Sequence, residues 1–495
     1  MSIKVIHDLM QRGKYDYAMQ LATSMAMEGN LEAMAYQCRI LDHQGLFQHE
    51  SQIAEELICR IDEMNNPDPS IIIIGSITKS FSRYRLGRIK EAIDLINKAQ
   101  KYMKKIDKEK ESDLMGRLLF VEGLVKNELG MREEGIEKLI AAYEIWDQLE
   151  NKLDKAITLN SIGVIHYERS ELVDALKSFK KALAILEEVG NETYASKVLN
   201  NIGLIHIERG DYDKAATFLQ RGIEIKKKLN SSHSTDFLHL NLGRIFFEQG
   251  NLEEAEQHFL RSLQLRRIIG NDINVSHSLY YLALTYTAKG EFQQAEQYIS
   301  ELEVLELSSE NRIVTARYLA SKAFWLKKQK RLYQKMQAYP LFEKIIKEYD
   351  TLDHNLTVFA IENLIDLTLI EATVSNEEWL VEEIYQLGQK LLKIGQMHRS
   401  YPVVINSLIL ISKIELIRKN MERAMNALEQ AILIAEEQGL ENHKEKAKAH
   451  QKEIENQIST WAKLIESNAD VVERVRQSDI LDYLTRITHV VKQRG

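Results

Sequence analysis

The chain has 495 residues, too many for a single compact core, so we expect either several domains or an elongated repeat array. It contains only 4 prolines and 22 glycines, and helix-forming residues dominate, so helix is expected nearly throughout. The net charge of −8, with 28% charged residues of both signs, argues against nonspecific nucleic-acid binding, which requires a basic face.

The apolar segments predict no membrane insertion. The longest apolar runs, Ile71–Ile74 and Leu408–Ile411, are far shorter than the ~20 residues that cross a bilayer. No apolar signal-peptide core follows Met1. Cys38 and Cys59 are too few for a disulfide framework, and both are expected as reduced thiols on apolar helical faces. Together these features predict a soluble, cytoplasmic protein.

In chain order, irregularly spaced turn signals come first, and a regular pattern follows. Gly13, Gly45 and Gly87 mark turns between helical segments near the N-terminus. Small residues then recur every forty positions, at Gly123, Gly163, Gly203, Gly243 and Ala283. A second series lies twelve positions after four of these, at Ala175, Ala215, Ala255 and Ala295. A fixed period of this length indicates a repeat architecture.

The recurring glycines require a packing reason. Each lies inside an expected helix, where glycine costs about 1 kcal/mol relative to alanine. Leu159, Ile162 and Gly163 define one face of a first helix, and Ala175 and Phe179 define one face of a second. A small residue on each helix lets an antiparallel pair cross closely, and the next pair covers the apolar surface that remains. We therefore predict stacked helix pairs with close Gly–Ala crossings.

Beyond Ser309 the helical periodicity continues, but the small-residue signature fades. Residues 441–466 form a long polar stretch with few apolar positions, as expected of a terminal cap. Ile480, Leu484 and Ile487 share one face of a last helix. That apolar face either caps the array or joins two copies of the chain in a homodimer.

The repeat resembles the tetratricopeptide repeat. Two of the matching sets are Leu159, Ile162, Gly163, Ala175, Phe179 and Ala182, and Leu199, Ile202, Gly203, Gly210, Tyr212 and Ala215. The long, forty-residue form is similar to the repeats of kinesin light chains, Pins-type adaptors and bacterial peptide-pheromone receptors. HEAT repeats share the period but do not explain the Gly…Ala offset.

The resemblance implies an all-α fold, a right-handed superhelical α-solenoid of antiparallel helix pairs with about nine to ten units. The sequence divides into four segments: divergent repeats at 1–110, the regular array at 111–309, divergent repeats at 310–440 and capping helices at 441–495. In this family the first helix of each pair lines a concave groove, so the resemblance places the binding face on the first helices.

Asparagines recur on the expected first helices. An amide side chain both donates and accepts hydrogen bonds, so it can pair with both polar groups of an extended peptide backbone. We assign a peptide-binding groove, centred on residues 117–290, to Asn160, Asn200, Asn201, Asn241, Arg244, Tyr280 and Tyr281. The alternative is that the amides bond to the backbone of neighbouring helices in adjacent repeats.

An acidic ladder follows the same period, at Glu128, Glu168, Glu208 and Glu248. Each acid falls near a helix C-terminus, where the helix dipole costs about 0.3–1 kcal/mol. One interpretation is an acidic stripe that selects a basic ligand. The other is a solvated position whose charge is offset by Arg169 or Arg209.

No phosphate loop, GxSxG elbow, HExxH or CxxC motif is present, so the sequence predicts no enzyme, no metal and no cofactor. The leading hypothesis is an adaptor that holds a protein or peptide, with no nucleic-acid partner. The first alternative is a peptide-gated regulator of the pheromone-receptor type. The second is an enzyme with a site in the C-terminal half, where His398, Arg399 and Tyr401 cluster.

Overall fold

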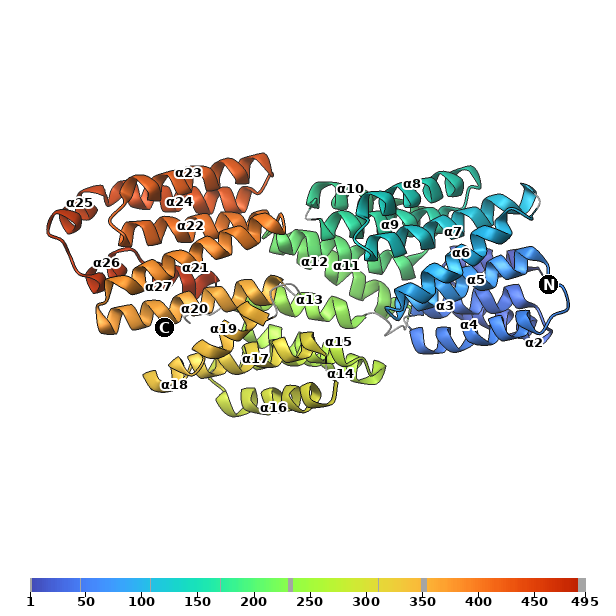
Figure 1. The fold of residues 1–495 in the computed structure, drawn as a ribbon, viewed down its shortest axis with the longest axis horizontal. Helices are drawn as coiled ribbons and strands as arrows, with labels where there is room; N and C mark the ends of the chain where they lie inside the picture. The colour runs from blue at the N-terminus through green and yellow to red at the C-terminus, as the bar shows by residue number, and fades with distance from the viewer. Residues whose placement is uncertain are drawn as a thin grey trace. The chain divides into compact units, whose positions relative to one another are not determined.

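The fold is all-helical in a computed structural model of the chain (Figure 1). The structure describes residues 2–44, 46–106, 108–169, 171–229, 235–309, 311–348 and 354–487. These ranges form 27 helices, which pack mainly against their neighbours in sequence. The predicted all-α solenoid of antiparallel helix pairs is therefore confirmed.

The contacts divide the chain into two units, which we describe separately. Unit 1 contains Met1–Ile205 and Thr217–Thr235, and unit 2 contains His206–Ala216 and Asp236–Gly495, so the boundary runs through two helices and after the first residue of a third. The two units are defined by contacts between residues. The four predicted segments are defined instead by how regular the repeat signature is along the sequence.

Unit 1 is built from six helix pairs. In order they are α1 (Ile3–Gln11), α2 (Tyr15–Met27), α3 (Leu31–Gln44), α4 (Phe47–Asp62), α5 (Pro69–Arg85), α6 (Ile89–Met103), α7 (Lys108–Glu128), α8 (Arg132–Gln148), α9 (Lys152–Glu168), α10 (Leu172–Val189), α11 (Glu192–Glu208) and α12 (Tyr212–Lys228). The odd-numbered helix is the first of each pair, and α11 and α12 extend into unit 2.

Unit 2 continues the pairs and ends in short helices. In order they are α13 (Thr235–Glu248), α14 (Leu252–Ile269), α15 (Asp272–Lys289), α16 (Phe292–Ser309), α17 (Arg312–Lys327), α18 (Leu332–Met336), α19 (Tyr339–Glu348), α20 (His354–Ser375), α21 (Glu378–Met397), α22 (Tyr401–Ile417), α23 (Met421–Glu437), α24 (Glu441–Asn456), α25 (Ile458–Glu466), α26 (Val471–Gln477) and α27 (Ile480–Ile487). Here α20 and α22 are the first helices of their pairs, packed against α21 and α23.

The recurring glycines allow close crossings within each pair. A Cβ added at Gly163 would lie 2.6 Å from the ring of Phe179, and one at Gly243 would lie 2.6 Å from the ring of Phe259. At Gly203 the nearest atoms belong to Leu219, at 2.8 Å. The prediction of a Gly–Ala contact is therefore corrected, because the glycine makes room for the large side chain four residues beyond the buried alanine.

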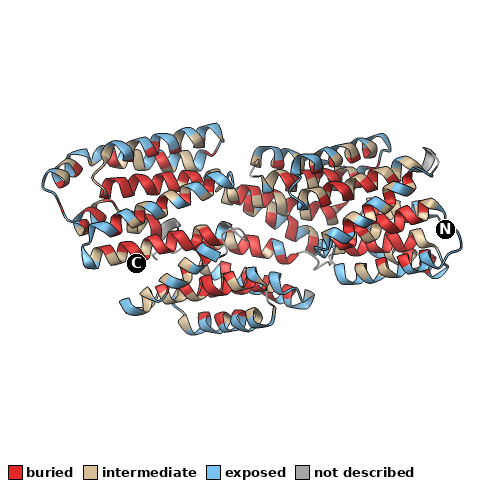
Figure 2. Ribbon diagram, in the orientation of Figure 1, coloured by how far each residue is buried: buried red, intermediate tan, exposed pale blue. Residues whose placement is uncertain are grey.

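Unit 1 closes on itself through its first helices. Asn191, at the start of α11, donates from Nδ2 to the carbonyl oxygen of Met10 at 2.9 Å and to the hydroxyl of Tyr15 at 3.2 Å. Asn191 is fully buried, and α1 also packs against α9. The first pair therefore meets the fifth pair and the start of α11. We call the first-helix side of these pairs the inner face, and Figure 2 shows more buried residues on α9 than on its partner α10.

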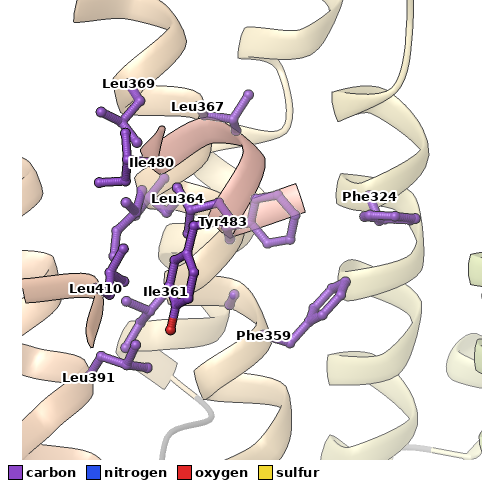
Figure 3. Close-up of a cluster of buried hydrophobic side chains, with 14 of the residues drawn as sticks. Phe324, Phe359, Ile361, Leu364, Leu367, Leu369, Leu391, Leu410, Ile480 and Tyr483 are labelled. Carbon is purple, nitrogen blue, oxygen red and sulfur yellow. The ribbon is translucent and has the colours of Figure 1, made fainter. Parts of the chain in front are cut away.

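In unit 2 the last two helices fold back onto the first helices α20 and α22. Ile480 and Leu484 of α27 are 0% exposed. Figure 3 shows Ile480 and Tyr483 among Leu364, Ile361 and Leu410. Two of the three residues of the apolar face for which the sequence left a cap and a homodimer as alternatives, Ile480 and Leu484, are thus buried in the chain's own core, and the side chain of Ile487 lies outside the described residues.

Two expectations about exposure can be compared with the structure. Cys38 is buried as expected, but Cys59 is exposed, so its placement on an apolar face was wrong. None of the helices in the described ranges combines the length and apolar character that a bilayer crossing requires.

Candidate functional site

A cavity of about 240 Å³ lies in unit 1. Its wall comes mostly from the first helices α3, α5, α7 and α9, with single residues from α4, α8 and α11. The exposed side chain of Glu168 belongs to the wall, so the cavity reaches the surface. The first helices therefore line a concave face, as the family resemblance implies.

An ion pair crosses this cavity wall between distant pairs. Arg39 of α3 contacts Asp154 of α9, with 2.5 Å between Nη2 and Oδ1, although 115 residues separate them. Burial acts to raise the pKa of Asp154, but Arg39 and Arg117 outweigh it and lower the pKa. The pair is thus charged at neutral pH, and it joins the second helix pair to the fifth.

A second ion pair lies between α5 and α3. Arg85 Nε lies 2.7 Å from Asp42 Oδ1, and the Arg85 guanidinium is 5.1 Å from the ring centres of both Phe47 and Phe81. Burial acts to raise the pKa of Asp42, but Arg85 and other cations lower it overall. The guanidinium is held by one acid and two rings, which fixes its direction.

The third wall arginine, Arg117 of α7, is held in the same way. Its Nε lies 2.9 Å from Asp113 Oδ2, its Nη2 donates to the hydroxyl of Tyr36 at 3.1 Å, and the Tyr36 ring centre is 5.3 Å away. Each of the three wall arginines thus has its own acidic partner.

Three wall residues, Glu50, His43 and Trp146, have no side-chain hydrogen-bond partner among the described residues. Glu50 is 1% exposed and neither carboxyl oxygen has a hydrogen-bond partner there. Burial, followed by repulsion from Asp42, raises the pKa of Glu50 to about 8. His43 is 7% exposed with both ring nitrogens unpaired, and burial lowers its pKa to about 3. Both groups are therefore neutral at pH 7 and can form hydrogen bonds with a ligand.

The predicted asparagines of unit 1 lie at the edge of this region. Asn160 lines the cavity. Asn201 Nδ2 donates to Asn160 Oδ1 at 2.9 Å, and Asn200 Nδ2 donates to Asn201 Oδ1 at 3.5 Å. The bond between Asn201 and Asn160 joins neighbouring pairs through side chains, whereas the bond between Asn200 and Asn201 lies within α11, and neither is the bond to a neighbouring helix backbone that was the alternative. All three are only half-buried, so their assignment to a peptide groove stays a prediction.

The acidic ladder does not form one uniform stripe. Glu128 and Glu168 are exposed, and Glu168 accepts a hydrogen bond from Asn127 at 3.1 Å. Glu208 and Glu248 are half-buried in unit 2, where Glu208 lies 3.9 Å from Arg244. Only Glu168 belongs to the cavity wall.

The other predicted groove residues belong to unit 2. Asn241 is 4% exposed and accepts from Arg244 at 3.5 Å. Tyr280 is 6% exposed, and the half-buried Tyr281 stacks on Phe259 with ring centres 5.0 Å apart. These two tyrosines contribute to the hydrophobic core of unit 2.

The first-helix face of the last pairs in unit 2 is covered by the chain itself. Arg474 of α26 is 1% exposed and bonds to the carbonyl of Ile417 and the carboxylate of Glu378. Lys413 Nζ donates to the carbonyl of Ser478 at 2.9 Å, and the Tyr483 hydroxyl donates to the carbonyl of Asn406 at 3.0 Å. Polar and apolar contacts together hold α26 and α27 on α22 and its neighbours.

Sequence reasoning missed the charged residues of the cavity. Arg39, Asp42, Glu50 and Arg85 lie in the segment assigned to divergent repeats, and Asp154 carries no repeat signature. The available signal was the presence of arginine and aspartate inside otherwise apolar helices such as Leu31–Gln44. Charged residues inside a buried helix are costly unless they are paired or functional.

The C-terminal cluster named as a possible enzymatic site lies at a turn. His398 caps the C-terminus of α21, Arg399 adopts a left-handed conformation with φ of 51°, and Tyr401 begins α22. Within the described ranges, no group of three or more His, Cys, Asp or Glu residues has a metal-binding arrangement.

Stacked antiparallel helix pairs, several with a glycine at the crossing, and a cavity on the first-helix face define the class of helical-repeat binding proteins. Two family models agree with this class. The model described as MalT-like TPR region matches residues 227–441, and the model described as tetratricopeptide repeat matches residues 114–188 and 171–228. The chain is a tetratricopeptide repeat protein.

Solved structures confirm the fold. The apo form of RapI matches with a TM-score of 0.53 and 14% identity, covering 72% of this chain and 96% of that one. A Signal Transduction ATPase with Numerous Domains with a tetratricopeptide repeat sensor, from Pyrococcus horikoshii, matches with a TM-score of 0.50 and 17% identity. That match covers 70% of this chain but 55% of the other. The comparison with curated proteins gives no match.

Proposed function

We propose that this protein is a scaffold or adaptor that holds a peptide segment of a partner on the inner face of unit 1. The cavity on the first helices is the observation that carries the proposal. It combines apolar wall residues such as Phe81 and Phe120 with polar groups such as Asn160, His43 and Glu50. Binding sites for peptides and small molecules typically have this mixture of apolar area and a few fixed polar groups.

The polar groups are suited to binding and not to bond cleavage. The three arginines are neutralised by carboxylates at 2.5–2.9 Å, and His43 is neutral at pH 7. A catalytic site requires a nucleophile, a base and a group that stabilises developing charge, assembled around a reacting atom. We therefore propose that the cavity binds its ligand without transforming it, and that no cofactor participates.

A matched pair of substitutions tests the proposal. Val164 is half-buried on the cavity wall, and Val173 is 62% exposed on α10. Peptides are selected from a random phage-displayed library on the full-length protein, and their affinities are then measured by fluorescence anisotropy. We expect Val164→Trp to fill the cavity and weaken binding at least about tenfold, which is about 1.4 kcal/mol, while Val173→Trp leaves it unchanged.

Thermal unfolding of both variants controls for loss of fold. If no peptide is enriched on the wild-type protein, or if a folded Val164→Trp variant binds the selected peptides normally, the cavity is not the peptide site.

One observation favours a peptide-gated regulator as a second candidate. The Arg39–Asp154 pair is part of the cavity wall and also joins α3 to α9. A ligand in the cavity would compete for these side chains and shift the equilibrium between a closed and an open form of unit 1. A ligand changes such an equilibrium when it contacts the two forms differently. We expect a selected peptide to change hydrogen exchange at the α1–α11 contact made by Asn191. Unchanged exchange at saturating peptide would leave only the scaffold role.

A further inference from the structure

The charges on the cavity wall do not balance. Arg39, Arg85 and Arg117 each have an acidic partner within 2.9 Å, so none of these cations is available to neutralise a further acid. Two acids on the wall remain, Glu168 and Glu50. The uncompensated charge of the cavity is therefore negative once both are ionised.

The two remaining acids differ in their surroundings. Glu168 is exposed and accepts a hydrogen bond from Asn127, so water and an amide stabilise its carboxylate. Glu50 is 1% exposed, and neither of its carboxyl oxygens has a hydrogen-bond partner among the described residues. A buried carboxyl without a partner is costly, so its retention inside a cavity indicates a partner that binds from outside the chain.

We propose that Glu50 anchors a cationic group, an alkylammonium or a guanidinium, of the molecule that enters the unit 1 cavity. The proposal rests on the proposed function, because it specifies which group of the ligand contacts the buried carboxyl of the cavity wall. Asp42 also acts electrostatically on Glu50, although its own charge is paired with Arg85.

The groups that face Glu50 from the adjacent helices support this choice. From α3, Asp42 repels its charged form, and the Cys38 thiol donates to its backbone oxygen at 3.6 Å. From α5, Arg85 attracts it but is already paired with Asp42. Lys197 of α11 acts on Asp42 and is not among the charges that act on Glu50. An incoming cation would therefore be the first direct counter-ion of Glu50.

Binding would be coupled to loss of a proton. The raised pKa of Glu50, about 8, keeps the carboxyl protonated in the empty cavity at pH 7. A cation stabilises the carboxylate, so Glu50 releases its proton to solvent when the ligand binds. Alkylammonium and guanidinium groups keep their charge up to about pH 10, so the pH dependence below that value reports on Glu50.

Small probes test the anchor on the full-length protein. The probes are n-butylammonium and n-butylguanidinium, with the neutral butyramide for comparison, and saturation-transfer NMR measures their affinities. We expect both cations to bind more tightly than butyramide. Their binding should be roughly tenfold weaker at pH 6.5 than at pH 8.5, since the binding-competent ionised fraction of Glu50 falls.

Variants and proton release complete the test. Glu50→Gln should abolish the preference for cations and the pH dependence, while Glu56→Gln, at a 53% exposed side chain on the same helix, should change neither. Calorimetry of the wild-type protein at pH 7 in buffers of different ionisation enthalpy should show that binding releases a proton. This measurement requires no variant, so it does not depend on whether a variant folds. Equal binding of butyramide, unaltered binding by Glu50→Gln or no proton release would overturn the anchor.

The outcomes separate the anchor from peptide binding. Selected peptides that bind equally well to Glu50→Gln would overturn the anchor while peptide binding stands. Cations that bind through Glu50 when no peptide is enriched would support the anchor and contradict the peptide scaffold. For enriched peptides, N-acetylation and replacement of lysine or arginine by norleucine show whether the cation is the peptide N-terminus or a side chain.

Discussion

The first-helix face differs between the two units. In unit 1 it lines a cavity whose wall includes Glu50 and His43, which are buried and have no hydrogen-bond partner among the described residues. In unit 2 the same kind of face, on α20 and α22, is covered by α26 and α27 of the chain itself. A helical repeat leaves this face without a neighbour at every pair, so each unit must cover it or leave it available for a ligand.

The chemistry of the two faces follows from this difference. Where the chain supplies its own cover, α26 and α27 provide hydrogen-bond partners for Lys413 and for the carbonyl of Asn406, although Ser412 Oγ and Glu415 Oε2 of α22 have none among the described residues. Where it supplies none, Glu50 and His43 remain unpaired among the described residues. The unit 1 face is thus distinguished by the position of its unpaired groups, which line a cavity.

The largest effect is expected in the covered face of unit 2. Leu484→Ala removes a 0% exposed side chain of α27 and should lower the free energy of unfolding of unit 2 by about 2–5 kcal/mol. Leu433→Ala, at a 56% exposed position, is the matched control. Hydrogen exchange measured by mass spectrometry should rise in α20 and α22. If exchange in these helices stays at the wild-type level, α27 does not stabilise that face.

The packing inside each pair should be equally sensitive in both units. Gly163→Ala and Gly243→Ala each place a Cβ 2.6 Å from a phenylalanine ring, so each should cost about 1–3 kcal/mol of unfolding free energy by overpacking. Gly388→Ala is the milder control, because its nearest contact is a flexible isoleucine methyl at 3.1 Å. Urea unfolding measures all three. A clear difference between Gly163→Ala and Gly243→Ala would mean that the repeats pack differently in the two units.

The local architecture could be predicted from the sequence because it depends on residues close along the chain. The spacing of Leu159, Ile162 and Gly163 placed one helix, observed as α9, and Ala175 and Phe179 placed the next, observed as α10. The partner of each glycine could not be read in the same way. The twelve-residue offset pointed to Ala175 as the partner of Gly163, whereas the side chain nearest to Gly163 in the structure is that of Phe179.

The candidate site depends on curvature accumulated over several pairs, which no local pattern encodes. Asn160 and Glu168 could be named because they repeat with the period, and both line the cavity. The sequence could not predict that Arg39 and Asp154 pair, because 115 residues separate them and their contact forms only when unit 1 closes. The same holds for Glu50, which became notable once the structure showed it buried and unpaired.

The unpaired acid should make the stability of unit 1 depend on pH. The folded-state pKa of Glu50, about 8, lies above its ordinary value of 4.5, so the folded state holds a proton that the unfolded chain has released between these values. Stability is therefore full below pH 4.5 and falls as the pH rises to about 8, by up to about 1.4 kcal/mol per pH unit. Urea unfolding between pH 5 and pH 8 measures this slope. Glu50→Gln should remove it, and a slope that persists unchanged in that variant would assign it to another group.

The smallest expected effect concerns the ion pair that joins α3 to α9. Arg39 and Asp154 are mostly buried, with side chains 20% and 10% exposed, so each single substitution leaves an uncompensated charge. A double-mutant cycle of Arg39→Gln and Asp154→Asn should give a coupling energy of about 1 kcal/mol. A control cycle with Arg60→Gln and Glu56→Gln, an exposed pair, should give close to zero. Equal coupling in the two cycles would mean that the cavity pair contributes no more than a surface pair, and that the closure of unit 1 depends instead on Asn191 and the apolar contacts around it.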